Sequence, residues 1–129
     1  MMGDNIVFQK ITSEILAVSS RASLNGPPLG QQLYESFVST LHKEFKELKE
    51  IESKFVKVFY KNKRNILSIE IQANAIKVTI NAKIGSLKDD KKLLRDVSNI
   101  GHWGNGDYQI RLQNKTLFKD VLKLVKQIY

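Results

Sequence analysis

The chain has 129 residues, of which 42% are hydrophobic and 26% are charged, a balance typical of one globular domain that buries its core without disulfides. It contains no cysteine, and its two histidines cannot complete a structural zinc site, so no metal and no cofactor is expected. The 21 Lys and Arg residues exceed the 13 Asp and Glu residues, so we expect anionic partners such as nucleic acid or an acidic protein surface.

Residues 1–29 are predicted to form an N-terminal extension, with a helix over 6–18 and a linker after it. Pro27 and Pro28 exclude a helix in the linker. No apolar run approaches the roughly 20 residues that span a bilayer, and the first residues lack a signal-peptide pattern. We therefore expect a cytoplasmic protein without a membrane partner, in which residues 30–129 form a single α+β domain.

The clearest helix is predicted over 31–48. The lysines and glutamates of this stretch fall on one side, where they can form solvated ion pairs. The apolar residues recur at spacings of three and four and share the other face: Leu33, Tyr34, Phe37, Val38, Leu41, Phe45 and Leu48.

The pattern then changes to a period of two, which is typical of strands. It predicts strands over 55–60, 66–72, 75–82 and 107–113. In the third of these, Ile76, Val78 and Ile80 share a packed face, whereas Lys77 and Thr79 lie on a solvated one. The short connections between the first three strands indicate antiparallel pairing.

Two more helices are expected, a short one over 93–97 and a final one that Asn114 or Thr116 caps. Together the elements predict an α+β fold. It consists of a four-stranded, mainly antiparallel sheet with two long helices packed on one face, plus the N-terminal helical extension.

Basic side chains gather in two predicted places, and we expect both to attract nucleic acid electrostatically. The candidate nucleic-acid-binding residues are Lys57, Lys61, Lys63 and Arg64 near the first strands, and Lys115, Lys119, Lys123 and Lys126 on the final helix. Because most of the basic residues are Lys rather than Arg, attraction to the phosphate backbone is favoured over direct base readout.

The stretch over 95–107 contains three of the seven glycines and the single Trp. In one interpretation it is a structural corner whose Trp103 plugs the end of the core. In the other it is a ligand-binding loop, and an exposed Trp103 would favour this second interpretation. The ligand-binding residues would then be Arg95, Asp96, His102, Trp103, Asn105 and Asp107.

No catalytic residue is predicted. Glu52-Ser53-Lys54 has a Glu-x-Lys spacing used by nucleases, but no acid stands on a convincing preceding strand. Asp89, Asp90 and Asp96 lie near several lysines, which favours solvated ion pairs over a magnesium site. The glycines of 101–106 precede a strand rather than a helix, so they do not form a phosphate cradle.

The stretch Arg95 to Tyr108 reads Arg-Asp-Val-Ser-Asn-Ile-Gly-His-Trp-Gly-Asn-Gly-Asp-Tyr, and a strand and a terminal helix follow it. It resembles the signature of a bacterial and archaeal domain family of unknown function labelled "predicted transport protein". The similarity extends weakly back to Gln31 and leaves out residues 1–29. The resemblance implies a small α+β domain that occurs alone or as the C-terminal module of nuclease or restriction-type proteins, without established catalytic residues.

We therefore expect a non-catalytic binding module that recognises nucleic acid or a protein partner such as a nuclease, within a restriction or phage-defence system. One alternative is a protein-interaction or oligomerisation domain. A second alternative is a small-ligand or enzymatic pocket at the loop over 95–107.

Overall fold

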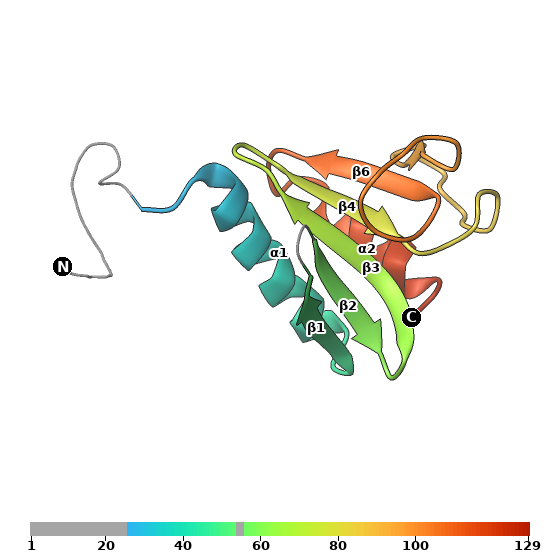
Figure 1. The fold of residues 1–129 in the computed structure, drawn as a ribbon, viewed down its shortest axis with the longest axis horizontal. Coiled ribbons are helices and arrows are strands. Elements are labelled where there is room, and N and C mark those ends of the chain that lie inside the picture. Colours follow the sequence, from blue (N-terminus) through green and yellow to red (C-terminus); the bar gives the residue numbers. More distant parts are fainter. Residues whose placement is uncertain (1–25, 54–55) are drawn as a thin grey trace.

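The computed structural model describes residues 26–53 and 56–129, which form one sheet with two helices against it (Figure 1). The helix predicted over 6–18 lies outside the described residues. The elements are α1 (Leu29–Glu44), β1 (Leu48–Glu52), β2 (Lys57–Lys61), β3 (Arg64–Ile71), β4 (Ile76–Ile80), β5 (Arg95–Asp96), β6 (Tyr108–Leu112) and α2 (Phe118–Lys126).

The sheet has six strands in the order β1-β2-β3-β4-β6-β5, and every neighbouring pair is antiparallel. The architecture is α+β, but the prediction of a four-stranded sheet is wrong. The four expected strands are present as β2, β3, β4 and β6. The two additional strands, β1 and β5, are the opposite edges of the sheet.

β1 was not predicted from the sequence, because the helical spacing of apolar residues continues past the end of α1. The helix ends at Glu44, and the Phe45 amide donates the last helical bond to the Leu41 carbonyl at 2.7 Å. Phe45 and Leu48 are still buried, because a turn over 46–47 returns the chain to the core. The other β1 residues are exposed, so the strand shows no alternation.

The prediction of a short helix over 93–97 is also wrong, because the backbone there is extended. Lys92 has a positive φ of 53°. The Asp89 carboxylate accepts the amides of Leu93 at 3.0 Å and Leu94 at 2.8 Å, which removes these donors from any helix. The two residues of β5 follow and pair with β6.

The ends of α2 differ slightly from the prediction. Leu117 is its N-cap residue and makes no side-chain cap bond. Asn114, one of the two predicted caps, instead accepts the Thr116 amide at 2.9 Å in the turn before the helix. Of the helices in the described part of the chain, none is long and apolar enough to cross a membrane.

Both helices pack on the same face of the sheet, which is called the inner face below. The Phe37 ring of α1 meets the Phe118 ring of α2 edge to face, with centroids 5.0 Å apart. Ile69 of β3 and Val78 of β4 are fully buried in the same core. The opposite face is called the outer face, and neither of the two described helices covers it (Figure 1).

Gly30 allows the start of α1 to dock on the hairpin between β3 and β4. Its amide donates to the Ala73 carbonyl at 2.9 Å. An added Cβ would lie 1.6 Å from the Gln72 carbonyl oxygen, so any larger residue would push α1 away from the sheet.

Candidate functional site

The glycine-rich loop over 97–107 folds back over the outer face of the sheet. Gly104 has a φ of +89°, and a Cβ there would lie 2.9 Å from the Ser68 Cβ. The Thr79 hydroxyl lies 3.5 Å from the Trp103 carbonyl oxygen. In Figure 1 the orange loop before β6 passes in front of the sheet, whereas α2 lies behind it. The loop therefore forms a partial second layer on the face opposite α1 and α2.

His102 bridges the two sides of this loop. Its Nδ1 lies 2.7 Å from the Ile100 carbonyl oxygen, and its Nε2 lies 2.9 Å from the Gly106 carbonyl oxygen. A carbonyl oxygen only accepts, so both contacts are hydrogen bonds when each ring nitrogen carries a proton. The ring of this predicted ligand contact is thus engaged within the loop itself.

Two predicted ligand-binding acids also bind the local backbone. The Asp107 carboxylate accepts the Ile84 amide at 2.9 Å. Asp96 accepts the Ser98 hydroxyl at 2.6 Å and the Ser98 amide at 2.9 Å, and these two bonds, the hydroxyl first, hold its pKa below the ordinary value. Asp96, His102 and Asp107 therefore shape the loop.

The other three predicted loop residues, Arg95, Trp103 and Asn105, are exposed to solvent. Trp103 is 53% exposed, although a Trp in a small domain is usually mostly buried. It therefore does not plug the core. The loop combines both interpretations, because one set of its side chains fixes the backbone and another set faces outward.

A cavity of about 210 Å³ lies between the loop and the outer face. A neighbouring cavity of about 480 Å³ shares Lys77, Arg95 and Gln109 with it and extends to Arg111. The polar and aromatic lining of the smaller cavity consists of Glu70, Lys77, Arg95, His102, Trp103 and Gln109.

The strand register brings the basic side chains of these cavities together. Lys77 of β4 lies opposite Arg111 of β6, and Arg95 of β5 lies opposite Gln109 of β6. Adjacent strands are about 4.8 Å apart, so the three basic residues lie within about two strand spacings across the sheet. Gln109, which lines both cavities, is buried, and its side-chain amide donates to the Thr79 hydroxyl at 3.1 Å. This bond fixes the orientation of the Gln109 side chain.

None of these three cations makes an ion pair with a residue that the structure describes. The Arg111 Nε donates to the Gln72 side-chain oxygen at 2.8 Å, which orients the guanidinium and leaves other N–H groups for a ligand. Glu70 lies opposite Lys77 in the strand register without forming an ion pair, and its charge lowers the positive potential at that end. The positive charge of the surface is therefore concentrated between Arg95 and Arg111.

The basic residues predicted near the first strands have other partners. Lys61 Nζ lies 2.9 Å from the Tyr129 carbonyl oxygen and 4.1 Å from the centre of the Tyr129 ring. Arg64 donates to the carbonyl oxygens of Ile128 at 2.6 Å and Tyr129 at 3.1 Å. Lys61 and Arg64 therefore fasten the segment after α2, whereas Lys63 is exposed.

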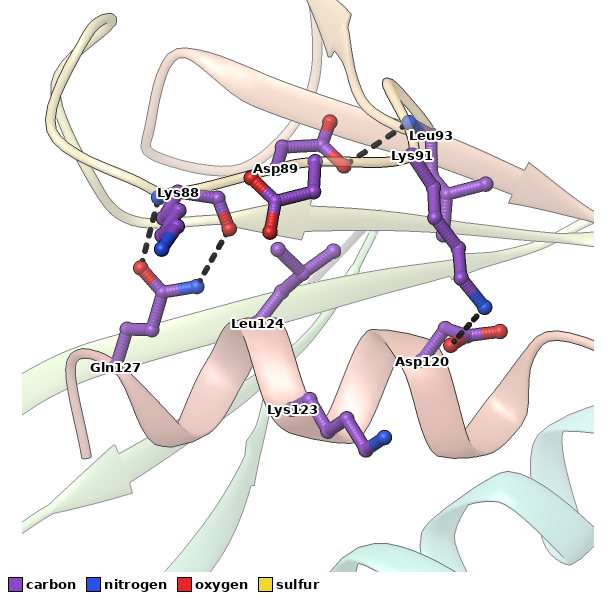
Figure 2. Close-up of a pocket in the computed structure, with 9 residues that line it drawn as sticks. Lys88, Asp89, Lys91, Leu93, Asp120, Lys123, Leu124 and Gln127 are labelled. Atoms are coloured by element: carbon purple, nitrogen blue, oxygen red, sulfur yellow. Dashed lines mark hydrogen bonds and ion pairs between the residues drawn. The ribbon is translucent and has the colours of Figure 1, made fainter.

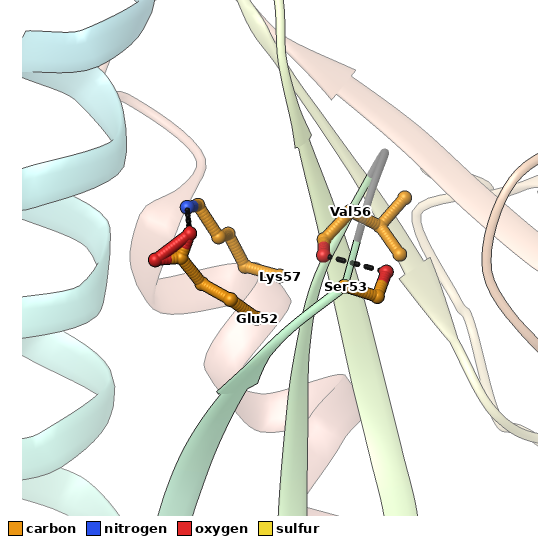
Figure 3. Close-up of polar contacts among 4 residues, drawn as sticks. All are labelled: Glu52, Ser53, Val56 and Lys57. Atoms are coloured by element: carbon orange, nitrogen blue, oxygen red, sulfur yellow. Dashed lines mark hydrogen bonds and ion pairs between the residues drawn. The ribbon is translucent and has the colours of Figure 1, made fainter.

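Lys57 pairs with Glu52 at 2.6 Å where β1 and β2 meet (Figure 3). The Ser53 hydroxyl donates to the Val56 carbonyl at 3.0 Å beside this pair. Glu52 is the acid of the Glu-x-Lys hypothesis, and Lys54 lies outside the described residues. The observed contacts of Glu52 are those of a hairpin end.

Three lysines of the predicted row, Lys119, Lys123 and Lys126, are exposed on α2. The fourth, Lys115, is also exposed but lies in the turn before the helix, so its prediction as a helical residue is wrong. The row and the cations of the outer face lie on opposite sides of the sheet, so one short ligand cannot contact both. The row therefore adds to the positive charge of the domain without lining the cavities of the outer face.

A larger cavity of about 530 Å³ lies between α2 and the segment over 88–93 (Figure 2). The Gln127 side chain accepts the Lys88 amide and donates to the Lys88 carbonyl, both at 2.8 Å. Lys91 pairs with Asp120 at 3.0 Å. These polar groups satisfy one another and fasten the segment to α2. Nowhere in residues 26–53 and 56–129 do three His, Asp or Glu side chains converge on a metal position.

Sequence reasoning did not single out Lys77, Gln109 and Arg111. They occupy outward positions of alternating strands, a pattern that indicates only a solvated face. Their grouping depends on the pairing of β4 with β6, which brings together residues far apart in the chain. An estimate of that register from the shared apolar face could have located them.

Comparison with known proteins finds a relative in Haemophilus influenzae, described as an uncharacterized protein. It is 38% identical over 97 residues, which cover 75% of this chain and 32% of the relative. The chain thus spans about a third of the length of that relative. No protein-family model and no solved structure matches the chain.

Proposed function

We propose that this domain is a non-catalytic nucleic-acid-binding module and that the outer face of its sheet is the contact surface. The observation that carries the proposal is the grouping of Lys77, Arg95 and Arg111 beside the exposed Trp103. Unpaired guanidinium groups bind phosphates, and an exposed aromatic ring binds the apolar face of a base.

The electrostatics of the whole chain support this proposal. The formal net charge is +8, so an anionic polymer is attracted before it makes any specific contact. The exposed lysine row of α2 contributes to this attraction from the other side of the sheet. Affinity on this account comes mainly from phosphate contacts, with the loop adding specificity.

We further propose that the module supplies recognition to a larger nuclease or phage-defence system in the bacterial cytoplasm. The resemblance of the Arg95 to Tyr108 stretch supports this setting. The length of the Haemophilus relative, of which the chain spans about a third, supports a module that is used within larger proteins. The rest of that relative is the natural candidate for a protein partner.

The test is fluorescence anisotropy with labelled oligonucleotides of about 12 nucleotides, within the usual site sizes. The double variant Arg95→Gln/Arg111→Gln removes two outer-face charges. We expect it to weaken binding by about tenfold, because the two charge contacts are solvent-exposed and contribute up to about 1 kcal/mol each.

The matched control is Lys119→Gln/Lys126→Gln, which removes the same charge from exposed positions of α2. It should weaken binding only a few-fold, through the lower net charge. Equal losses in the two double variants would reject the outer face as the contact surface. Absence of binding to any oligonucleotide would reject the function.

A protein-interaction domain is the second candidate, and one observation favours it. β1 is an edge strand, and its Ile51 is 55% exposed. Sedimentation of Ile51→Lys beside the unchanged chain tests this candidate, because loss of an oligomer would support an interface at β1. A single mass for both proteins would argue against self-association there.

A further inference from the structure

The proposed nucleic-acid surface has the shape and chemistry for a single strand rather than a duplex. We infer that an unpaired base stacks on Trp103 while Arg95 and Arg111 hold the adjoining phosphates. The inference rests on the proposed function and specifies its ligand class.

The first step concerns how Trp103 is held. Its neighbour Gly104 lies directly on β3 and β4, and His102 ties the loop to itself through the Ile100 and Gly106 carbonyls. The indole is therefore presented by a fixed backbone, and 53% of its surface is exposed to solvent. An exposed aromatic ring on a fixed backbone binds a base with little loss of conformational entropy.

The second step concerns the size of the cavity beside the ring. Its volume of about 210 Å³ lies below the roughly 300–1,000 Å³ of clefts for drug-sized ligands. The space suits one ring rather than a whole cofactor. Gln109 and Glu70 line it and offer hydrogen-bonding groups to the edge of a base.

The third step concerns the position of the charges. Arg95 lines both cavities, so a phosphate that it binds lies beside a base on Trp103. Arg111 and Lys77 line the adjoining cavity, where the next part of the backbone would run. A row of cations beside an aromatic platform is the usual arrangement of proteins that bind single strands.

The fourth step is that a duplex fits this face poorly. Reading a major groove requires a projecting helix or a two-stranded ribbon, and the outer face presents a sheet and a loop that lies flat on it. The bases of a duplex are stacked and paired, so their faces cannot reach Trp103. An unpaired base, by contrast, can leave its neighbours and stack on the ring.

The test uses the intrinsic fluorescence of the full chain, in which Trp103 is the single Trp. Unlabelled oligo(dT) and oligo(U) of about 12 nucleotides are titrated beside a duplex of about the same length. We expect either or both single strands to quench the Trp emission in a saturable way and the duplex to leave it unchanged. The ratio of the two single-strand affinities tells DNA from RNA.

Two variants of Trp103 test whether the aromatic ring contributes to binding, with anisotropy of labelled strands as the readout. Trp103→Ala should weaken single-strand binding by about 5- to 150-fold, whereas Trp103→Phe should retain most of it because a ring remains. Circular dichroism should be the same for both variants, since the side chain is half exposed.

The outcomes distinguish this inference from the proposed function. Duplex binding that equals single-strand binding, or Trp103→Ala with unchanged affinity, overturns the single-strand inference while the function survives. If Trp103→Ala loses binding and its circular dichroism is also altered, the decision rests on Trp103→Phe and on quenching in the unchanged chain. Binding by Trp103→Phe together with quenching supports the inference, and the absence of either overturns it. Absence of binding to every oligonucleotide overturns both proposals.

Discussion

The two sides of the sheet carry cavities of different character. The one between α2 and the segment over 88–93 is the larger, about 530 Å³, and its lining balances Lys88, Lys91 and Lys123 against Asp89, Asp90 and Asp120, with Lys91 and Asp120 paired at 3.0 Å. The one under the loop is about 210 Å³, and Lys77 and Arg95 at its edge make no ion pair with a described residue. The lining charge of the larger cavity is therefore balanced, whereas the charge around Lys77 and Arg95 is positive, and this excess supports the proposed contact with anions there.

The comparison assigns the side chains of the loop over 97–107 to two tasks. His102 and Asp107 bind backbone groups and fix the loop, as Lys88 and Gln127 do on the other side of the sheet. Trp103 is held out by that framework. Changes to the framework should therefore alter stability and binding together, whereas changes to the solvent-exposed side chains should alter binding more than stability.

The largest effect is expected at Gly106. Its φ is +120°, and an added Cβ would lie 2.1 Å from the Ile80 carbonyl oxygen. Gly106→Ala should lower the free energy of unfolding by about 2–5 kcal/mol through backbone strain and overpacking. Denaturant unfolding measures this loss.

The control for that variant is Gly101→Ala, because a Cβ at Gly101 meets nothing within 4 Å. Its free energy of unfolding should stay within about 0.5 kcal/mol of the original value. If Gly106→Ala were as stable as Gly101→Ala, the described seating of the loop on the sheet would be wrong.

His102→Ala should have the next largest effect. It removes both contacts that join the Ile100 and Gly106 carbonyls, so stability should fall by about 1–2 kcal/mol. Thermal unfolding checks the loss, and oligonucleotide affinity should fall with it because Trp103 loses its support. His42→Ala is the control, since His42 is exposed on α1 and should cost less than about 0.5 kcal/mol.

The fold could be predicted from sequence where one face of an element is buried. β4 alternates cleanly because Ile76, Val78 and Ile80 all face the core. β1 and β5 could not be predicted, because edge strands with exposed residues carry no apolar period. The two carbonyl partners of His102 could not be predicted either, since the folded loop determines which backbone groups lie beside the ring.

Glu70→Gln should change binding in the opposite direction. Glu70 lies opposite Lys77 and repels an anion at that end of the surface. Its neutralisation should raise oligonucleotide affinity by about two- to fivefold. Glu44→Gln makes the same charge change at the end of α1, and a similar gain there would show that only net charge matters.

Lys91→Gln tests the cavity between α2 and the segment over 88–93. The Lys91 to Asp120 pair is partly exposed, so stability should fall by only about 0.5 kcal/mol. Oligonucleotide affinity should remain close to that of the unchanged chain, unlike that of Arg95→Gln with the same charge change. An equal loss of affinity in the two variants would erase the distinction between the cavities.

The smallest expected effect is the change in stability when acid protonates Asp96. The two bonds from Ser98 lower the pKa of Asp96 in the folded chain below the ordinary value of 3.8. These bonds therefore stabilise the fold at pH values above the pKa of the unfolded chain, and this contribution is lost as the pH falls through the pKa of the folded chain. Asp96→Asn should therefore flatten the pH dependence of stability slightly below pH 4. Unfolding curves at successive pH values measure the change, and identical curves would show that the Ser98 bonds contribute nothing.

The most direct test of the outer face as a phosphate-binding surface is the salt dependence of oligonucleotide binding. A plot of the logarithm of the association constant against the logarithm of salt concentration has a slope of about −0.7 per phosphate contact for a single strand. Arg95→Gln should make this slope less steep by about 0.7, one contact. A slope unchanged in Arg95→Gln, or an affinity that does not depend on salt, would contradict the account.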